Sequence, residues 1–210
     1  MAEIKRPIFF TGENPIITLH VPDTEQIAAI ASYWTCTDSQ AGIGHALVLW
    51  LAEEKEGIGH GCIFTDNPEL AHMLVENLTQ HFPEFETVPV CTLPYVEANC
   101  GHTYDGKRYQ AKCHTENIQM EITWMDILDR KQVVWPGFPT GEKVFDLTTV
   151  ICPCRVGEIK INGNAINGEV SIVRGDDGNY SSTAFLAFAE TWIGPFDKEI
   201  ESMIFVGREA

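Results

Sequence analysis

The sequence is poor in basic residues and lacks a long apolar run. It contains 14 lysine and arginine residues against 30 aspartate and glutamate residues, which gives a formal net charge of −16. Proteins that bind nucleic acid or anionic membranes need clustered basic side chains, and no basic cluster here exceeds two residues. The longest apolar run, residues 46–52, is far shorter than the roughly 20 residues of a membrane-spanning helix. We therefore expect neither nucleic acid nor a membrane as a partner.

Signals for secretion are also missing. The chain reaches Asn14 without the apolar stretch of a signal peptide. Its seven cysteines are an odd number, which is not typical of a disulfide framework. We therefore expect a cytoplasmic protein whose cysteines are mostly reduced. The sequence leaves open whether it is a monomer or a homodimer.

Motifs that bind nucleotides or activate a nucleophile are absent as well. There is no nucleophile elbow, no dinucleotide-binding fingerprint and no phosphate-binding glycine loop. The Gly-x-Gly segments at 42–44 and 57–59 precede predicted strands rather than helices, so they do not form a phosphate site. We expect chemistry that needs no cofactor.

The first part of the chain predicts a strand followed by a helix. Residues 16–21 are typical of a short strand, which Pro22 ends. Asp23 and Gln26 form a capping box for a helix. The apolar residues that follow at helical spacing are Ile27, Ile30, Ala31 and Trp34.

A hairpin and a second helix come next. The apolar segments 45–53 and 58–64 predict two paired strands, of which the first is buried on both faces because it barely alternates. Asn67 and Pro68 are typical of a helix start, as a capping residue and a first-turn proline. The apolar stripe predicted for this helix is Leu70, Leu74, Leu78 and Phe82.

The rest of the chain predicts strands separated by turns. These strands lie near 88–104, 107–128, 131–135, 143–152, 158–162, 168–174 and 181–192. Residues 136–141 predict a long surface loop, and residues 200–206 fit either strand or helix. We expect one α+β domain over 1–210, with a strand- and helix-rich part at 14–92 and a β-rich part at 93–206. Its main feature is a mainly antiparallel, strongly curved β-sheet or β-barrel of meander type, with two helices in the N-terminal half.

The predicted hairpin around Asp105 and Gly106 carries the most informative side chains. A two-residue turn there pairs His102 with Tyr109. Alternation then places one set of side chains on the inner face: Ala98, Cys100, His102, Tyr109, Ala111 and Cys113. The opposite face is polar and is predicted to contact water.

Three interpretations of this inner face are open. Cys100, His102 and Cys113 are candidates for zinc, but structural zinc needs four ligands and no fourth is identifiable, so we expect no metal. Alternatively, His102 acts as general acid or base in a pocket, with Tyr109 as a proton donor. In the third interpretation the cysteines pack as core hydrophobes and the histidine bonds to a neighbour.

His60 and Glu190 are the other candidate catalytic residues. His60 alternates with Cys62 and Phe64 and is therefore predicted to face inward. Glu190 belongs to an apolar strand, where desolvation would raise the pKa of its carboxyl group unless an arginine or histidine pairs with it. Alternatively, it lies exposed at the rim, near the end of the strand. The residues predicted to share its face are Ala184, Leu186, Phe188 and Trp192. Candidates for the pocket wall are Cys100, Cys113, Trp124, Phe188 and Trp192.

A short segment resembles a known family. The sequence Leu-Pro-Tyr-Val-Glu at 93–97, followed by Tyr-Asp-Gly at 104–106, resembles the Pro-Tyr-x-Glu segment of acetoacetate decarboxylase-like barrels. The lysine nucleophile of that family has no counterpart here, so no residue role is transferred.

The preferred hypothesis is a cofactor-independent enzyme for a small, largely apolar organic molecule. It would be an isomerase, lyase or cyclase that works by general acid/base chemistry in a β-barrel pocket. His102 or Glu190 is the predicted base, Tyr109 the proton donor, and His60 a further candidate. Two alternatives are a non-catalytic carrier of the same fold and a protein-interaction module that uses an exposed sheet edge.

Overall fold

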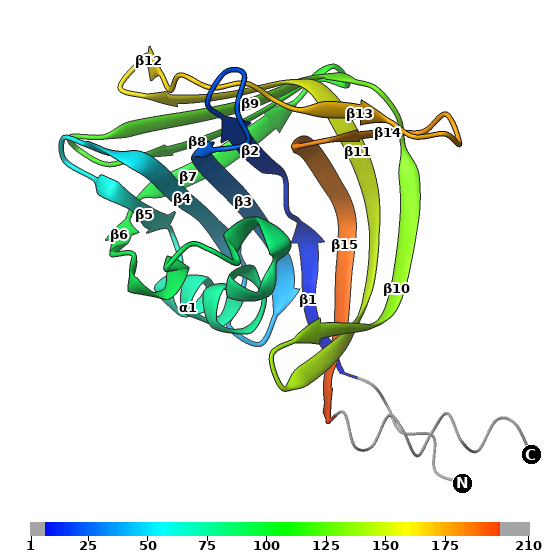
Figure 1. Cartoon of the computed structure of the whole chain (residues 1–210). Helices are drawn as coiled ribbons and strands as arrows, with labels where there is room; N and C mark the ends of the chain where they lie inside the picture. Colours follow the sequence, from blue (N-terminus) through cyan, green and yellow to red (C-terminus); the bar gives the residue numbers. More distant parts are fainter. Residues whose placement is uncertain (1–6, 198–210) are drawn as a thin grey trace, which may run out of the picture.

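The computed structural model describes residues 7–197, most of which lie in a single curled sheet (Figure 1). The first five strands are β1 (Ile8–Glu13), β2 (Ile16–His20), β3 (Ile27–Ser39), β4 (Gly44–Lys55) and β5 (Gly59–Thr65). The next five are β6 (Tyr95–Glu97), β7 (Asn99–Tyr104), β8 (Arg108–His114), β9 (Gln119–Ile127) and β10 (Lys131–Thr140). The last five are β11 (Lys143–Ile161), β12 (Asn164–Ala165), β13 (Ile172–Arg174), β14 (Tyr180–Ser182) and β15 (Ala184–Asp197).

One α-helix, α1 (Pro68–Asn77), is present between residues 7 and 197, where the sequence predicted two. Three short 3-10 helices follow it, at Thr79–His81, Pro83–Phe85 and Val90–Thr92. No helix in this range is long and apolar enough to cross a membrane. The segment 200–206 lies outside the described residues.

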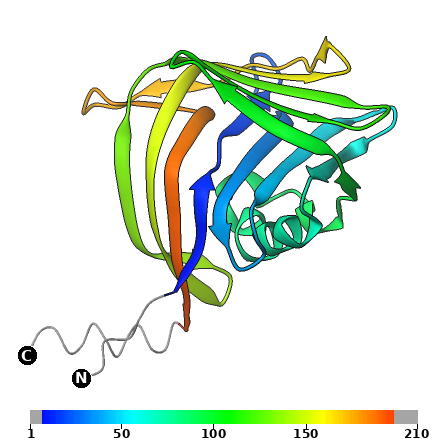
Figure 2. The ribbon, with the colours of Figure 1, turned by 180° about the vertical axis from the view of Figure 1, so that it is seen from behind.

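The sheet is mixed and mainly antiparallel. Its strand order is β6-β5-β4-β3-β1-β15-β11-β9-β8-β7, with β2, β10 and β12 attached beside this path. Only the β5–β6 pair is parallel among the pairings described. Seen from behind, β15 lies between β1 and β11, so the two halves of the chain share one sheet (Figure 2). The end strands β6 and β7 do not pair with each other in the described range, so pairing does not close the predicted barrel.

The first predicted helix is wrong, because residues 27–39 form strand β3. Ala31 and Tyr33 of this strand contact the core on one face of the sheet, whereas Ile30 and Trp34 contact the core on the other. A strand buried on both faces is apolar at nearly every position, including those spaced like a helical stripe. Tertiary burial therefore produced the pattern that predicted a helix.

The second predicted helix is confirmed, although it is shorter than its apolar stripe. Asn67 caps it, since its Oδ1 accepts a hydrogen bond from the backbone N–H of Leu70 at 3.1 Å. The helix ends at Asn77, and the buried Leu78 and Phe82 belong to the turns that come after it. Together these residues cover the outer face of the sheet.

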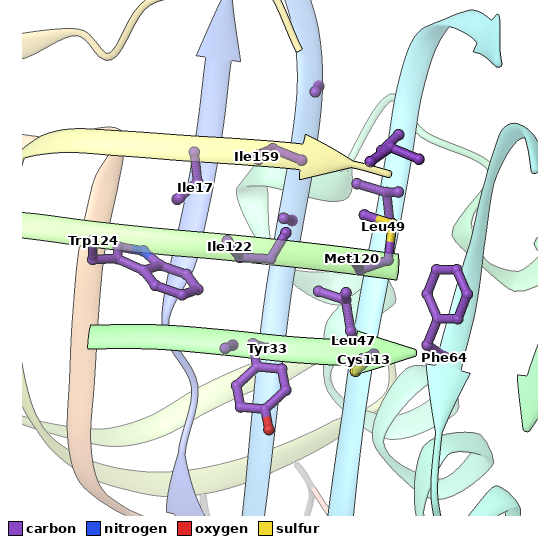
Figure 3. Packing of buried hydrophobic residues seen from close by; sticks show 14 of the residues in the cluster. Ile17, Tyr33, Leu47, Leu49, Phe64, Cys113, Met120, Ile122, Trp124 and Ile159 are labelled. Atoms are coloured by element: carbon purple, nitrogen blue, oxygen red, sulfur yellow. The ribbon is translucent and has the colours of Figure 1, made fainter. Parts of the chain in front are cut away.

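Two hydrophobic cores lie on opposite faces of the sheet. The inner core fills the space where β8, β9 and β11 cross over β2, β3 and β4, with Tyr33, Met120 and Trp124 among its members (Figure 3). The outer core lies under α1 and includes Trp34, Leu74 and Trp192. Strand β4 is buried on both faces, as the sequence predicted.

The predicted surface loop at 136–141 belongs mostly to β10. Pairing with β11 is interrupted after Trp135 and resumes where Phe138 lies opposite Phe145. The Phe138 ring also contacts the Trp192 ring, with centroids 5.2 Å apart. This aromatic contact anchors a segment whose glycine and prolines suggested a loop.

Candidate functional site

The β7–β8 hairpin carries the predicted side chains on its inner face, in a different register. Cys100 lies opposite Cys113 and His102 opposite Ala111, so the predicted pairing of His102 with Tyr109 is wrong by two residues. A shift of two residues leaves each side chain on its original face. Tyr109, Ala111 and Cys113 are accordingly buried in the inner core.

The turn of this hairpin explains the shift. Asp105 accepts hydrogen bonds through Oδ1 from the backbone N–H groups of Lys107 and Arg108, at 2.9 and 2.8 Å. This aspartate turn lengthens the connection beyond the two residues expected from Asp-Gly alone.

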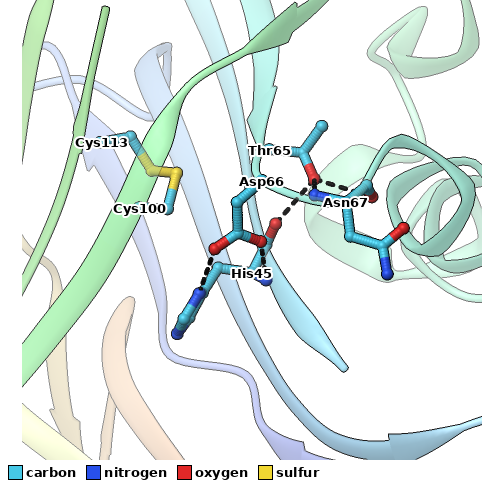
Figure 4. The surroundings of a disulfide bond; sticks show 6 residues. All are labelled: His45, Thr65, Asp66, Asn67, Cys100 and Cys113. Carbon is cyan, nitrogen blue, oxygen red and sulfur yellow. Dashed lines mark hydrogen bonds and ion pairs between the residues drawn. A yellow bond between two sulfur atoms is a disulfide. The ribbon is translucent and has the colours of Figure 1, made fainter. Parts of the chain in front are cut away.

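Cys100 and Cys113 form a disulfide across the hairpin (Figure 4). Their Cα atoms are 4.1 Å apart, which is close to the spacing of directly opposed residues in an antiparallel pair. The other five cysteines are free thiols. The bonded sulfurs are thus not available as zinc ligands, and no group of three or more His, Cys, Asp or Glu between residues 7 and 197 is arranged to hold a metal ion.

Five polar side chains meet beside the inner core, and we call them the polar cluster. They are Glu13 of β1, His45 of β4, Asp66 after β5, His102 of β7 and Tyr109 of β8. The side chains of His45, Asp66, Glu13 and His102 are 23%, 32%, 27% and 28% exposed. Water and small molecules can therefore reach all of them except Tyr109, which is buried.

Asp66 holds His45 at two points. Its Oδ2 lies 2.7 Å from Nδ1 of His45, and its Oδ1 accepts the backbone N–H of His45 at 2.6 Å (Figure 4). A carboxylate on Nδ1 favours the tautomer that carries the proton there. Nε2 of His45 is then the ring atom available to accept a proton from a substrate.

Local sequence brings Asp66 this close to β4. Gly44 has φ +150°, and a Cβ there would lie 2.7 Å from Oδ1 of Asp66, so only glycine fits without displacing the carboxylate. Thr65 donates a hydrogen bond from Oγ1 to the carbonyl of His45 at 2.7 Å. Asn67, next in the chain, caps α1, so the end of β5 and the start of the helix place Asp66 between them.

Glu13 organises the other half of the polar cluster. The hydroxyl of Tyr109 donates to Oε2 of Glu13 at 2.8 Å, and Nε2 of His102 is 4.0 Å from the same oxygen. The His102 ring stacks on the Tyr109 ring, with centroids 5.0 Å apart and planes 4° from parallel. Burial lowers the pKa of His102, so its imidazole is neutral at pH 7. Burial and the charge of Glu13 raise the pKa of Tyr109, which keeps its hydroxyl protonated.

The two halves of the polar cluster lie side by side. The ring centroids of His45 and His102 are 6.1 Å apart, and the Tyr33 ring contacts both. The buried hydroxyls of Tyr33 and Thr35 lie next to Tyr109, and neither makes a well-formed hydrogen bond within residues 7–197. The base of the polar cluster thus retains hydrogen-bonding capacity.

Three of the remaining sequence candidates lie in three different places. Phe188 is partly buried near the polar cluster, 6.0 Å from the Tyr109 ring. Trp124 is a core residue behind Tyr109, and its indole N–H donates to the carbonyl of Ile16 at 2.9 Å. His60 does not face the inner core as predicted, because its side chain is 54% exposed and contacts Glu54 at 3.5 Å.

Glu190 and Trp192 lie on the opposite, outer face of the sheet. In the pairing of β15 with β11, three residue steps along β15 match two along β11, and Ala189 is the extra residue with φ +49°. This β-bulge reverses the alternation of side chains. The predicted common face is therefore wrong at this point, since Leu186 and Phe188 contact the inner core whereas Glu190 and Trp192 face outward.

The sequence pointed to the hairpin half of the polar cluster and missed the other half. Glu13, His45 and Asp66 were not among the predicted residues. The Thr65-Asp66-Asn67 run between a strand and a helix cap was the available signal, because polar residues at such a junction lie at a sheet edge. Glu13 had no comparable signal, since it reaches Tyr109 from 96 positions away.

Comparison with known proteins yields distant similarities only. The sequence matches no family model and no curated protein. The chain is similar in structure to acetoacetate decarboxylase from Legionella pneumophila, at 11% identity and a TM-score of 0.47, over 94% of this chain and 91% of that one. A second acetoacetate decarboxylase structure gives 11% identity and a TM-score of 0.41, over 90% and 86%. At these scores neither structure informs the chemistry of the polar cluster.

Proposed function

We propose that this chain is an enzyme that moves a proton on a small organic molecule at the polar cluster. The observation that carries the proposal is the pairing of two histidines with two carboxylates, all four partly exposed, within one group of contacts. Such a set supplies a general base and a general acid without a metal or a cofactor.

In this proposal each half of the polar cluster has a different role. His45, oriented by Asp66, takes a proton from carbon next to a substrate carbonyl through Nε2. His102 hydrogen-bonds the carbonyl oxygen, on which negative charge develops. Tyr109 is buried and already bonded to Glu13, so it acts as a positioning residue that orients the carboxylate beside His102.

The surroundings of the polar cluster fit a substrate with an apolar part. Phe188 and the exposed edge of Tyr104 lie against each other near Tyr109, with ring centroids 5.3 Å apart. The hydroxyls of Tyr33 and Thr35 are buried next to Tyr109, so they belong to the base of the polar cluster and are not themselves exposed to a substrate.

Proton exchange on carbon tests this function without knowledge of the natural substrate. A panel of small ketones and 2-oxo acids is incubated with the protein in D2O, and loss of the α-proton signal is followed by NMR. We expect the protein to accelerate exchange of at least one compound. His45→Gln and His102→Gln should each slow that exchange by about a hundredfold, the usual contribution of such a group.

The matched control is His72→Gln. His72 is exposed on α1 and stacks on Tyr95, with ring centroids 3.8 Å apart, so its loss should leave exchange unchanged. The proposal is wrong if no compound exchanges faster than in buffer, or if both cluster variants, folded as judged by circular dichroism, exchange as fast as the unaltered protein.

A further inference from the structure

A pocket lies on the outer face of the sheet, opposite the polar cluster. It has a volume of about 440 Å³, within the range of small-molecule sites. Its lining combines residues of β10, β11 and β15 with the turns after α1. The aromatic members are Phe82, Trp135, Phe138, Phe185 and Trp192.

Glu190 is the carboxylate buried in this pocket, at 4% exposure. Its Oε1 accepts a hydrogen bond from the indole N–H of Trp192. Its Oε2 has no hydrogen bond to any residue between 7 and 197, and no lysine or arginine of this range lines the pocket. A buried carboxylate is costly unless it is paired or neutral, so the ionised form of Glu190 lacks a second donor and a positive partner in this pocket.

We propose that this pocket binds a small apolar molecule that carries a primary amine. The ammonium group hydrogen-bonds to Oε2 of Glu190, and the hydrocarbon part lies against Trp192 and the other rings. A ligand ammonium supplies both the missing donor and the missing charge, which a neutral or anionic ligand does not. The net charge of −16 also favours the approach of a cation.

Binding of the amine is linked to the proton on Glu190. Burial raises the pKa of Glu190 to about 8, so the carboxyl group is mostly protonated at pH 7 and an ammonium displaces that proton. Two other titratable side chains line the pocket: His81, whose pKa burial lowers, and Glu84, whose pKa burial raises. Neither adds a positive charge at pH 7. Affinity for an amine should therefore rise by up to about tenfold per pH unit between pH 6 and pH 8.

Titration calorimetry with 2-phenylethylamine and with 2-phenylethanol tests the proposal. The two probes share a carbon skeleton and differ in charge. At pH 8 we expect the amine to bind at least ten times more tightly than the alcohol. Glu190→Gln should remove this preference. Trp135→Ala changes a half-exposed residue of the pocket wall and should weaken binding of the amine several-fold. This second variant tests the pocket even if Glu190→Gln folds poorly.

Glu13→Gln is the matched control, because it removes a carboxylate from the polar cluster on the other face. It should leave amine binding unchanged, so failure of the proposed catalytic function and failure of this pocket are distinguishable. Equal binding of alcohol and amine would overturn the proposal. The proposal would also be overturned if Glu13→Gln abolished binding of the amine while Trp135→Ala and a folded Glu190→Gln both left that binding intact.

Discussion

Glu190 is a carboxyl group placed where a charge is poorly solvated. Burial raises its pKa from 4.5 to about 8, and the Trp192 N–H only partly offsets this. The folded protein therefore holds this proton over a pH range in which the unfolded chain has lost it. Below about pH 4.5 both states are protonated, and above about pH 8 both are charged. Stability contributed by the proton is thus lost as the pH rises from about 4.5 through about 8.

Replacing Glu190 with glutamine should remove this loss, since glutamine keeps the shape and still accepts the Trp192 hydrogen bond. We expect the free energy of unfolding of Glu190→Gln, relative to that of the unaltered protein, to be higher at pH 9 than at pH 5.5 by about 1 kcal/mol or more. Urea unfolding at the two pH values measures it. Glu116→Gln, at an exposed position, should show no such gain. A stability difference that does not change with pH would contradict the assignment.

His45 and His60 show how residue-scale context separates similar sequences. Each histidine ends a Gly-Ile-Gly-His segment, at 42–45 and 57–60. His45 meets Asp66 and the polar cluster, whereas His60 lies at the exposed end of a hairpin. The difference arises at the junction between β5 and α1, because Asp66 of that junction reaches His45 and does not reach His60.

At the scale of elements, irregular pairing decides which face a residue occupies. The bulge at Ala189 turns Glu190 and Trp192 to the outer face, and the Asp105 turn moves the β7–β8 register by two residues. The first changed the predicted face because it inserted one residue. The second left the predicted face intact because it moved the register by an even number.

The burial of the free cysteines and the disulfide between β7 and β8 together predict the order in which the thiols are labelled. Of the five free cysteines, Cys91 is exposed and Cys36, Cys62, Cys152 and Cys154 are buried. Labelling of the native protein without reductant should therefore modify Cys91 first. Denaturation should raise the number of labelled cysteines to five. Denaturation with added reductant should raise it to all seven, because Cys100 and Cys113 are bonded to each other.

Mass spectrometry of the labelled protein reads out each step. Cys91→Ser should abolish the fast label and leave the later counts one lower. Rapid labelling of Cys113 in the native protein would show that the two cysteines are not opposed as described.

At the scale of the whole molecule, the excess of acidic residues opposes compactness. The acidic side chains of a 210-residue chain with a net charge of −16 repel one another. The ion pairs described, such as Arg155–Asp126, are largely surface contacts and therefore offset little of this repulsion. Salt screens this repulsion, since the screening length falls from about 30 Å at 0.01 M to about 8 Å at 0.15 M ionic strength.

We therefore expect sodium chloride to stabilise the protein over this range. The midpoint of thermal unfolding should rise by about 2–4 °C, which corresponds to about 1 kcal/mol for a chain of this size. Differential scanning calorimetry at the two salt concentrations measures the shift. A midpoint that falls with salt would mean that attractive ion pairs outweigh the repulsion.

Features that depend on neighbours along the chain could be predicted from the sequence alone. Alternation placed Cys100, His102 and Tyr109 on one inner face, and Asn67 with Pro68 located the start of α1. Burial on both faces concealed β3, because its apolar residues also fit a helical stripe. Glu13, His45 and Asp66 meet the hairpin only in the folded protein, since those contacts join strands far apart in the chain. Short-range patterns report which face a residue prefers, whereas pairing between distant strands decides which residues meet there.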